Sequence, residues 1–332
     1  MTNLKLRHRR QFLHLVAGAA ALPAVSRAAW AQTYPTRPVR LIVPFPPGGL
    51  VDTIARPIGQ WLSDRLHKPF IIENRPGAGT NIGTEAVVRA PPDGHTLLLA
   101  STANAINATL YDKLSFEFIR DVVPVAGIVR LPIMMVVIPS FPAKTVPEFI
   151  AYAKANPGKI NMASVGNGTA QHVVGEWFKM MTGVNMMHVP YRGGAALLTD
   201  LLSARVEVYF PDTFGVYVQH VRTGKLRALA VMGPRRLEVL PDIPRIDDFL
   251  SGLDASDWVG LVAPKNTPAE IIAKLNGEIT AGLADPKLKA RLADLVPGAT
   301  MLTGSPAEFG KLIAQDTAKW AKVVKFAGIR LE

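Results

Sequence analysis

A serine, a histidine and a glutamate fall within one glycine-containing stretch, SVGNGTAQHVVGE, which runs from Ser164 to Glu176. A serine hydrolase needs a nucleophile, a base and an orienting acid, and Ser164 with His172 is the pair that could begin such a set. Ser164 precedes the glycines instead of lying between them, so the stretch is not a nucleophile elbow. His172 and Glu176 could share a metal on a helix, but no third ligand lies nearby and the HExxH pattern is absent. We expect no catalytic residue and no metal, and keep an exported serine hydrolase as the remote alternative.

Paired glycines raise a second possibility, the binding of an anion. Gly48 and Gly49 lie in LIVPFPPGGLVDTIAR, between an apolar run and a helix-like run. They could hold nucleotide phosphates, hold a carboxylate or make a tight turn. No Gly-Lys-Ser/Thr follows them, and the glycines at 166 and 168 lack the third glycine and acidic residue of a dinucleotide fingerprint. We therefore expect no cofactor. Asp52 and Arg56, four residues apart, predict a helix ion pair first and a ligand contact second.

The elements that would position these loops alternate between strand-like and helix-like segments, which is typical of an α/β protein. The predicted helices begin near Ile54, Phe149, Val173, Pro268 and Pro306, and Pro57 must kink the first or lie in its opening turn. Glycine loops at 44–49, 75–81, 166–168 and 193–194 fall between a strand and a helix, where α/β proteins bind ligands. The predicted strands are 40–43, 70–73, 96–100, 122–129, 133–138, 186–189, 206–210 and 226–231. Histidines 67, 95, 188 and 220 are isolated in the sequence and predict surface or packing roles.

The first 31 residues predict an export signal. Four basic residues precede a short apolar core at 12–25, and Ala29-Trp30-Ala31 fits cleavage after Ala31. Arg9 and Arg10, followed by Gln-Phe-Leu, match the twin-arginine type, although an ordinary secretory signal can also carry paired arginines. The expected location is the periplasm. The net charge of +11 falls to +6 without this segment and is spread along the chain, which argues against nucleic-acid binding. The chain has no cysteine, so disulfides and thiolate metal sites are excluded.

The order of the motifs resembles the Bug-type periplasmic solute receptors of tripartite tricarboxylate transporters. The matching stretches span nearly all of the chain after the signal and include YPTRPVRLIVPFPPGGLVDTIAR, ENRPGAGTNIGTEAVVRAPPDGHTLLLAS, HVPYRGGAALLTDLLSARVE and WVGLVAPKNTP. The resemblance implies a non-enzymatic α/β protein with a two-domain fold like that of type II periplasmic binding proteins, and a ligand cleft between the domains. The implied domains are residues 34–130 plus 256–332, and residues 131–255.

The resemblance also implies which residues contact the ligand, a small carboxylate. The first domain would hold a carboxylate through backbone groups and water, with glycine where the backbone approaches closely. The second domain would cover the other end. The implied residues are Pro44, Phe45, Pro47, Gly48, Gly49, Asp52, Ser101, Thr102, Ala103 and Asn104, then Ser164, Gly166, Asn167, Gly168, Thr169, His172, Tyr191, Gly193 and Asp212.

Two departures from the family pattern concern the second domain. Gly194-Ala195-Ala196 replaces a small residue, a glycine and a proline, and Pro211 displaces Asp212 from its usual place. Asp212 is therefore either a ligand contact or a helix N-cap. The implied mechanism is closure of a monomer around the ligand, with hinges near 125–130 and 255–260, followed by delivery to membrane permease subunits. A sensor for a signalling partner is the alternative. Which carboxylate binds stays open.

Overall fold

The computed structural model describes residues 34–111, 113–233, 235–253 and 255–329. The predicted export signal and its cleavage site lie outside these residues. The chain divides into Met1–Thr36 and Arg37–Glu332, and the description below concerns the second part. Among the described residues, no helix has both the length and the apolar character needed to cross a membrane.

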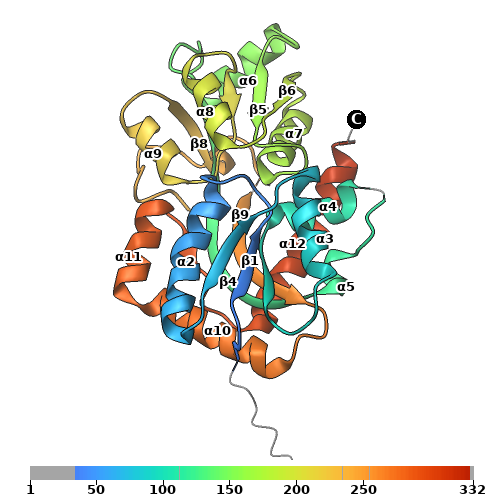
Figure 1. Cartoon of the computed structure of the whole chain (residues 1–332). Coiled ribbons are helices and arrows are strands. Elements are labelled where there is room, and N and C mark those ends of the chain that lie inside the picture. The colour runs from blue at the N-terminus through green and yellow to red at the C-terminus, as the bar shows by residue number, and fades with distance from the viewer. Residues whose placement is uncertain (1–33, 112, 234, 254, 330–332) are drawn as a thin grey trace, which may run out of the picture. The chain divides into compact units, whose positions relative to one another are not determined.

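The second part is built on a sheet whose strands run in the order β2-β1-β3-β9-β4-β7-β5-β6, with β8 and β10 both pairing with β4. We call the part around β9 sheet A and the part around β5 sheet B. Figure 1 shows sheet A in the lower half and sheet B in the upper half. Sheet A contains β1 (Val39–Val43), β2 (Phe70–Asn74), β3 (Thr96–Ser101), β9 (Ser256–Pro264), β10 (Thr300–Met301) and the first part of β4 (Val122–Val137). Sheet B contains the end of β4, β5 (Asn161–Ser164), β6 (Met187–Pro190), β7 (Val208–Tyr209) and β8 (Arg227–Met232).

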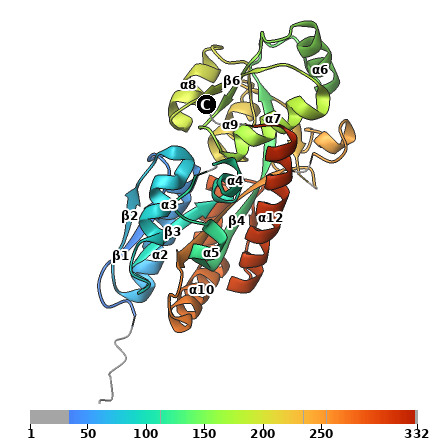
Figure 2. The same cartoon turned by 90° about the vertical axis from the view of Figure 1, so that its right-hand side faces the viewer.

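Helices cover both sheets. Around sheet A, α2, α10 and α11 pack together, as do α3, α4 and α12. In Figure 1, α2 and α11 lie to the left of the sheet and α3, α4 and α12 to the right, and Figure 2 shows α12 running beside β4. The helices of this half are α2 (Leu50–Leu66), α3 (Asn81–Val88), α4 (Thr102–Leu110), α5 (Phe118–Asp121), α10 (Ala269–Ala284), α11 (Pro286–Leu295) and α12 (Pro306–Phe326), with the 3-10 turn η1 (Ala78–Thr80). Around sheet B lie α6 (Val146–Ala155), α7 (Ala170–Thr182), α8 (Gly194–Leu202), α9 (Gly215–Arg222) and the 3-10 turn η2 (Ile246–Asp248).

Strand order follows from the alternation of strands and helices. β1 pairs in parallel with β2 and β3, and β5 pairs in parallel with β6 and β7, because a helix returns the chain to the same edge each time. The carboxyl ends of β1 and β3 in sheet A, and of β5 and β6 in sheet B, are each followed by a helix N-terminus. The predicted α/β architecture is confirmed, and it brings the glycine loops to these edges.

β4 joins the two sheets as one uninterrupted strand. The sequence predicted two strands, 122–129 and 133–138, and this prediction was wrong because residues 130–132 continue the ladder. β4 pairs with β9 as far as Pro132, and from Ile133 onward it pairs with β8. Proline has no N–H to donate, and Pro132 lies where the strand changes partner, so its presence does not interrupt the strand.

Three strands were not predicted. β5 is only four residues long and has no β-branched residue, while β10 is two residues long. β9 is fully buried, and the sequence predicted only a hinge, near 255–260, in this stretch. Pro57 lies beyond the opening turn of α2, because the helix begins at Leu50, four residues before its first predicted position.

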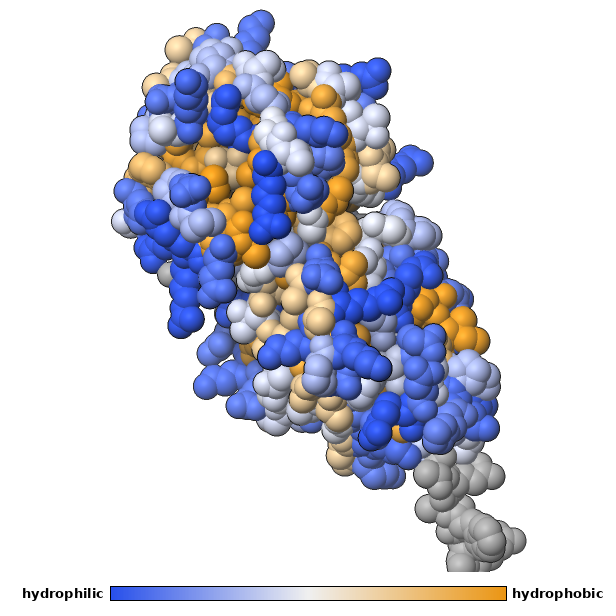
Figure 3. All heavy atoms as spheres, turned by 90° about the vertical axis from the view of Figure 1, so that its left-hand side faces the viewer, coloured by the Kyte–Doolittle hydropathy of each residue, from blue (hydrophilic) through white to orange (hydrophobic). Residues whose placement is uncertain are grey.

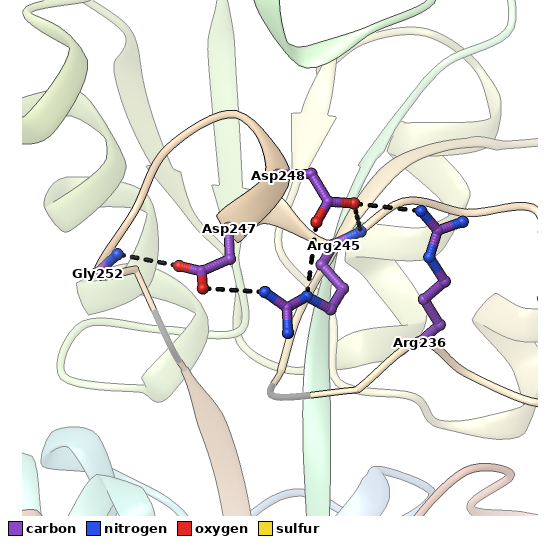
Figure 4. A network of polar contacts seen from close by, with 5 residues as sticks. All are labelled: Arg236, Arg245, Asp247, Asp248 and Gly252. Atoms are coloured by element: carbon purple, nitrogen blue, oxygen red, sulfur yellow. Dashed lines mark hydrogen bonds and ion pairs between the residues drawn. The ribbon is translucent and has the colours of Figure 1, made fainter.

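A polar network fixes the long connection from β8 to β9. Arg245 contacts Asp247 at 3.0 Å and Asp248 at 3.7 Å, and Arg236 donates to Asp248 at 3.2 Å. The backbone N–H of Gly252 donates to Asp247 (Figure 4). These partly exposed ion pairs each contribute little to stability, but together they restrain the segment that leads into β9.

Candidate functional site

A cavity of about 510 Å³ lies where the loops of sheet A meet those of sheet B. This volume is in the range of small-molecule sites. Of the residues predicted to bind a ligand, nine line the cavity: Phe45, Pro47, Gly48, Gly49, Ser101, Ala103, Thr169, Gly193 and Asp212. The other ten lie outside its lining: Pro44, Asp52, Thr102, Asn104, Ser164, Gly166, Asn167, Gly168, His172 and Tyr191.

Five helix N-termini border the cavity, those of α2, α4, α7, α8 and α9. Ser101 caps α4 and Thr169 caps α7 with their side chains. The N-caps of α2 and α8 are Gly49 and Gly193, and no side chain bonds to either terminus. The first N–H groups of a helix have no partner within the helix and carry positive partial charge. This side of the cavity is therefore suited to an anion, and Arg192, which is exposed, adds a full positive charge to its lining.

Asp52 holds the loop of Gly48 in place. Its carboxylate accepts hydrogen bonds from the backbone N–H of Gly48 at 2.8 Å, from Asn74 and from Arg56. Burial is the largest single effect and would raise its pKa, but the bonds from Gly48, Asn74 and Arg56 together lower the pKa below its usual value. The predicted ion pair with Arg56 forms. Asp52 thus fixes the conformation of the loop by accepting a hydrogen bond from it, and its own side chain does not line the cavity.

Gly48 and Gly49 leave open space where a side chain would stand. Gly48 has φ +80, a conformation that favours glycine, and a Cβ there would meet no atom within 4 Å. At Gly49, which has φ −78, a Cβ would meet only the carbonyl oxygen of Pro46 at 3.6 Å. A larger side chain at either position would extend into free space beside the cavity.

The acidic side of the cavity is formed by Asp212 and Asp257. Burial, followed by repulsion from Asp257, raises the pKa of Asp212 to about 7. Burial also raises the pKa of Asp257 to about 6, although hydrogen bonds from Thr102 and Trp258 act in the opposite direction. Despite the displacement by Pro211, Asp212 both lines the cavity and accepts a hydrogen bond from the N–H of Phe214 at 3.1 Å. The N-cap of α9 is Phe214, so the predicted N-cap role of Asp212 was wrong, and its contact with a ligand stays a prediction.

His188, which is isolated in the sequence, has a packing role in the structure. Its ring stacks on that of His172 with centroids 3.9 Å apart, and its Nε2 lies 2.7 Å from Ser164 Oγ. Burial, the largest effect, lowers the pKa of His172 to about 3 and that of His188 to about 4, so both are neutral at pH 7. Ser164 therefore contacts His188 and not His172, and none of the three lines the cavity. The described residues contain no group of three potential metal ligands.

Gly168 serves a different contact. A Cβ on Gly168 would overlap the side chain of Asn107 in α4, and a Cβ on Gly79 would lie 2.9 Å from the carbonyl oxygen of Asn167. This loop therefore packs against helices of sheet A. Its small residues permit close approach between two parts of the chain instead of forming the cavity wall.

Sequence reasoning missed several cavity residues. Arg192 is next to the predicted Tyr191 in the sequence, and Gln171 is next to the predicted His172. The sequence therefore identified the correct loops but chose residues in them that do not line the cavity. Tyr209, Tyr217 and Asp257 carried no motif, since they lie in strands or at a helix start and read as core. Figure 3 shows hydrophobic residues gathered between hydrophilic ones in the half built on sheet B.

Comparisons with known proteins identify the family. Residues 54–329 match the family model described as "Tripartite tricarboxylate transporter family receptor" (TctC). The chain is 34% identical to Protein BugT of Bordetella pertussis, over 91% of this chain and 93% of that one.

Two of the similar solved structures contain a carboxylate ligand. Rpa4515 of R. palustris with adipate is 33% identical, with a TM-score of 0.84, covering 90% of this chain and 99% of that one. MatC of Rhodopseudomonas palustris with bound malate is 30% identical, with a TM-score of 0.82, covering 88% and 100%. The fold is that of periplasmic binding proteins, as the sequence predicted. The chain belongs to the TctC family of tripartite tricarboxylate transporter receptors, which are periplasmic solute-binding proteins and not enzymes.

Proposed function

We propose that this receptor captures a small carboxylate in the cavity and delivers it to the membrane permease subunits of a tripartite tricarboxylate transporter. The observation that carries the proposal is the meeting of two uncapped helix N-termini, at Gly49 and Gly193, in one cavity. Backbone N–H groups at such termini bind carboxylates without requiring a charged side chain. Adipate and malate in the two relatives support the ligand class.

The proposed mechanism is closure of two domains around the ligand. The domains are those predicted from the sequence, residues 34–130 plus 256–332 and residues 131–255, and the change of strand partner at Pro132–Ile133 supports this division. The predicted hinge at 125–130 contains irregular pairing between β4 and β9. A Cβ on Gly193 would lie 3.3 Å from Pro46, so the two glycine loops lie in contact where both line the cavity. A ligand that touches both loops favours the closed state by that difference in contacts.

Export by the twin-arginine route, cleavage after Ala31 and function as a monomer belong to the same proposal. The N-terminal segment with Arg9, Arg10 and Ala31 supports the first two. Mass measurement of the secreted protein tests the cleavage site, and light scattering on a sizing column tests the monomer.

The ligand class is tested by thermal unfolding of the mature protein against aliphatic and aromatic mono-, di- and tricarboxylates. A ligand that binds only the folded state, at a hundredfold excess over its Kd, adds about 2.7 kcal/mol to the free energy of unfolding. We expect one class of acid to raise the unfolding midpoint. Mass spectrometry of the denatured protein controls for a ligand retained during purification. If ligand-free protein responds to no acid, the carboxylate proposal is wrong.

A further inference from the structure

The acidic side of the cavity contains two carboxylates in neutral surroundings. Asp212 is 4% exposed and Asp257 is 6% exposed, and both line the cavity. Asp212 accepts hydrogen bonds from the amide of Gln171 at 3.0 Å and from a backbone N–H. Asp257 accepts from the backbone N–H groups of Thr102 and Trp258. All of these donors are uncharged, so they solvate the carboxylates without neutralising them.

Neither carboxylate forms an ion pair with lysine, arginine or histidine anywhere in the described part of the chain. The two also lie near enough for Asp257 to repel the charge of Asp212. Burial of an uncompensated charge is costly, and buried charges in proteins are normally paired. Since neither carboxylate is paired with a cationic side chain among the described residues, a positive group on the ligand would provide the missing partner.

Aromatic rings line the same part of the cavity. The rings of Tyr209 and Tyr217 meet edge to face with centroids 5.3 Å apart, and the ring centroids of Phe214 and Tyr217 are 6.4 Å apart. All three residues line the cavity, and the hydroxyls of the two tyrosines hydrogen bond to each other. Aromatic faces attract cations through their quadrupole, and carboxylates beside aromatic rings are a common setting for an ammonium group.

We propose that the ligand is a zwitterion, with its carboxylate at the helix N-termini of α2 and α8 and a protonated nitrogen between Asp212 and Asp257. The inference rests on the proposed function, because the same cavity holds the carboxylate. A dicarboxylate would instead place its second negative charge beside Asp212 and Asp257, and it would bind only if carboxyl groups at that end of the cavity took up protons. A zwitterion presents to each end of the cavity a charge opposite to the charge of that end, so it can bind without any change of protonation.

The test compares ligands of equal length by calorimetry at about pH 7.5. Succinate, glutarate and adipate are each matched with the ω-amino acid of the same carbon number, with the corresponding monocarboxylate and with the corresponding alkylamine. At the best chain length, we expect the amino acid to bind about tenfold or more tightly than the dicarboxylate and the monocarboxylate. The proposal is overturned if the dicarboxylate binds more tightly at every length, or if no member of the series binds.

The same series separates this inference from the proposed function. Binding of dicarboxylates but not of amino acids refutes the ammonium site and leaves the carboxylate receptor standing. Binding of alkylamines without any acid refutes the carboxylate receptor and keeps the ammonium site.

Two variants supply an independent readout. Asp212→Asn and Asp257→Asn should each weaken the amino acid about tenfold and strengthen the dicarboxylate, because each removes one negative charge from that end of the cavity. A reversed preference between two ligands cannot come from misfolding. Asp242→Asn, at an exposed position, is the matched control and should keep the wild-type preference. An unchanged preference in both cavity variants overturns the assignment.

Discussion

The buried carboxylate of Asp212 should make the unliganded protein less stable as the pH rises. Its pKa is raised from 3.8 to about 7 in the folded chain, first by burial and then by Asp257. Between these values the folded state keeps a proton that the unfolded state has lost, so the free energy of unfolding falls with rising pH. A shift of about three pKa units corresponds to about 4 kcal/mol at most, reached near pH 7.

Asp212→Asn should remove this decrease in the free energy of unfolding with rising pH. Asparagine keeps an acceptor for the N–H of Phe214, and Gln171 can turn its amide to accept from the new side chain. We expect the variant to lose less stability than the wild type between about pH 4.5 and pH 7.5, by up to about 4 kcal/mol.

The assay is urea unfolding of ligand-free protein at several pH values in that range, with Asp242→Asn as the control. The comparison must be a difference between variants, since His172 and His188 act in the opposite direction. Their lowered pKa values make the unfolded state bind more protons below about pH 6.5, so they increase stability as the pH rises. Parallel pH curves for the wild type and Asp212→Asn would refute the reasoning.

The remaining predictions concern the glycine loops and their supports. Gly49→Leu should abolish ligand binding, measured by calorimetry, while the unfolding midpoint stays near that of the wild type, because φ at this position suits any residue; retained affinity would contradict the proposed cradle. Asp52→Ala should lower the free energy of unfolding at pH 7 by about 1–3 kcal/mol and weaken ligand binding, because the N–H of Gly48 loses its acceptor. Since the pKa of Asp52 is lowered in the folded state, this difference should shrink as the pH falls through that lowered pKa, and a constant difference would argue against it. Gly168→Ala should weaken the contact with Asn107 and lower the melting temperature in calorimetry, and an unchanged melting temperature would show that the loop can move aside.

Much of the fold was predictable because its signals are local. The runs that form β1, β3 and α12 are strongly apolar or regularly amphipathic, and proline and glycine mark the loops between them. β5 was missed because four residues carry too little pattern. The continuity of β4 could not be read either, since Pro132 indicates a break unless the neighbouring strands are known.

The cavity was predictable in part for a related reason. Glycines next to helix starts reveal where a backbone can approach a ligand, so Gly48, Gly49 and Gly193 were found from sequence. Asp257 was not, because its position depends on β9 pairing with both β3 and β4. The stacking of His172 on His188 likewise depends on tertiary structure, since the two residues come from different elements.

The length of β4 has a consequence for how the molecule unfolds. Its 16 residues pair with β9 at one end and with β8 and β7 at the other, so neither half of the protein has a complete sheet without the other. Loss of either half would expose the edge of a strand that the remaining half still needs. A strand shared in this way couples the two halves energetically. The chain should therefore melt as one cooperative unit, although its helices surround two different sheets. The strand that contains the proposed hinge is thus also the one that should prevent the two halves from unfolding independently.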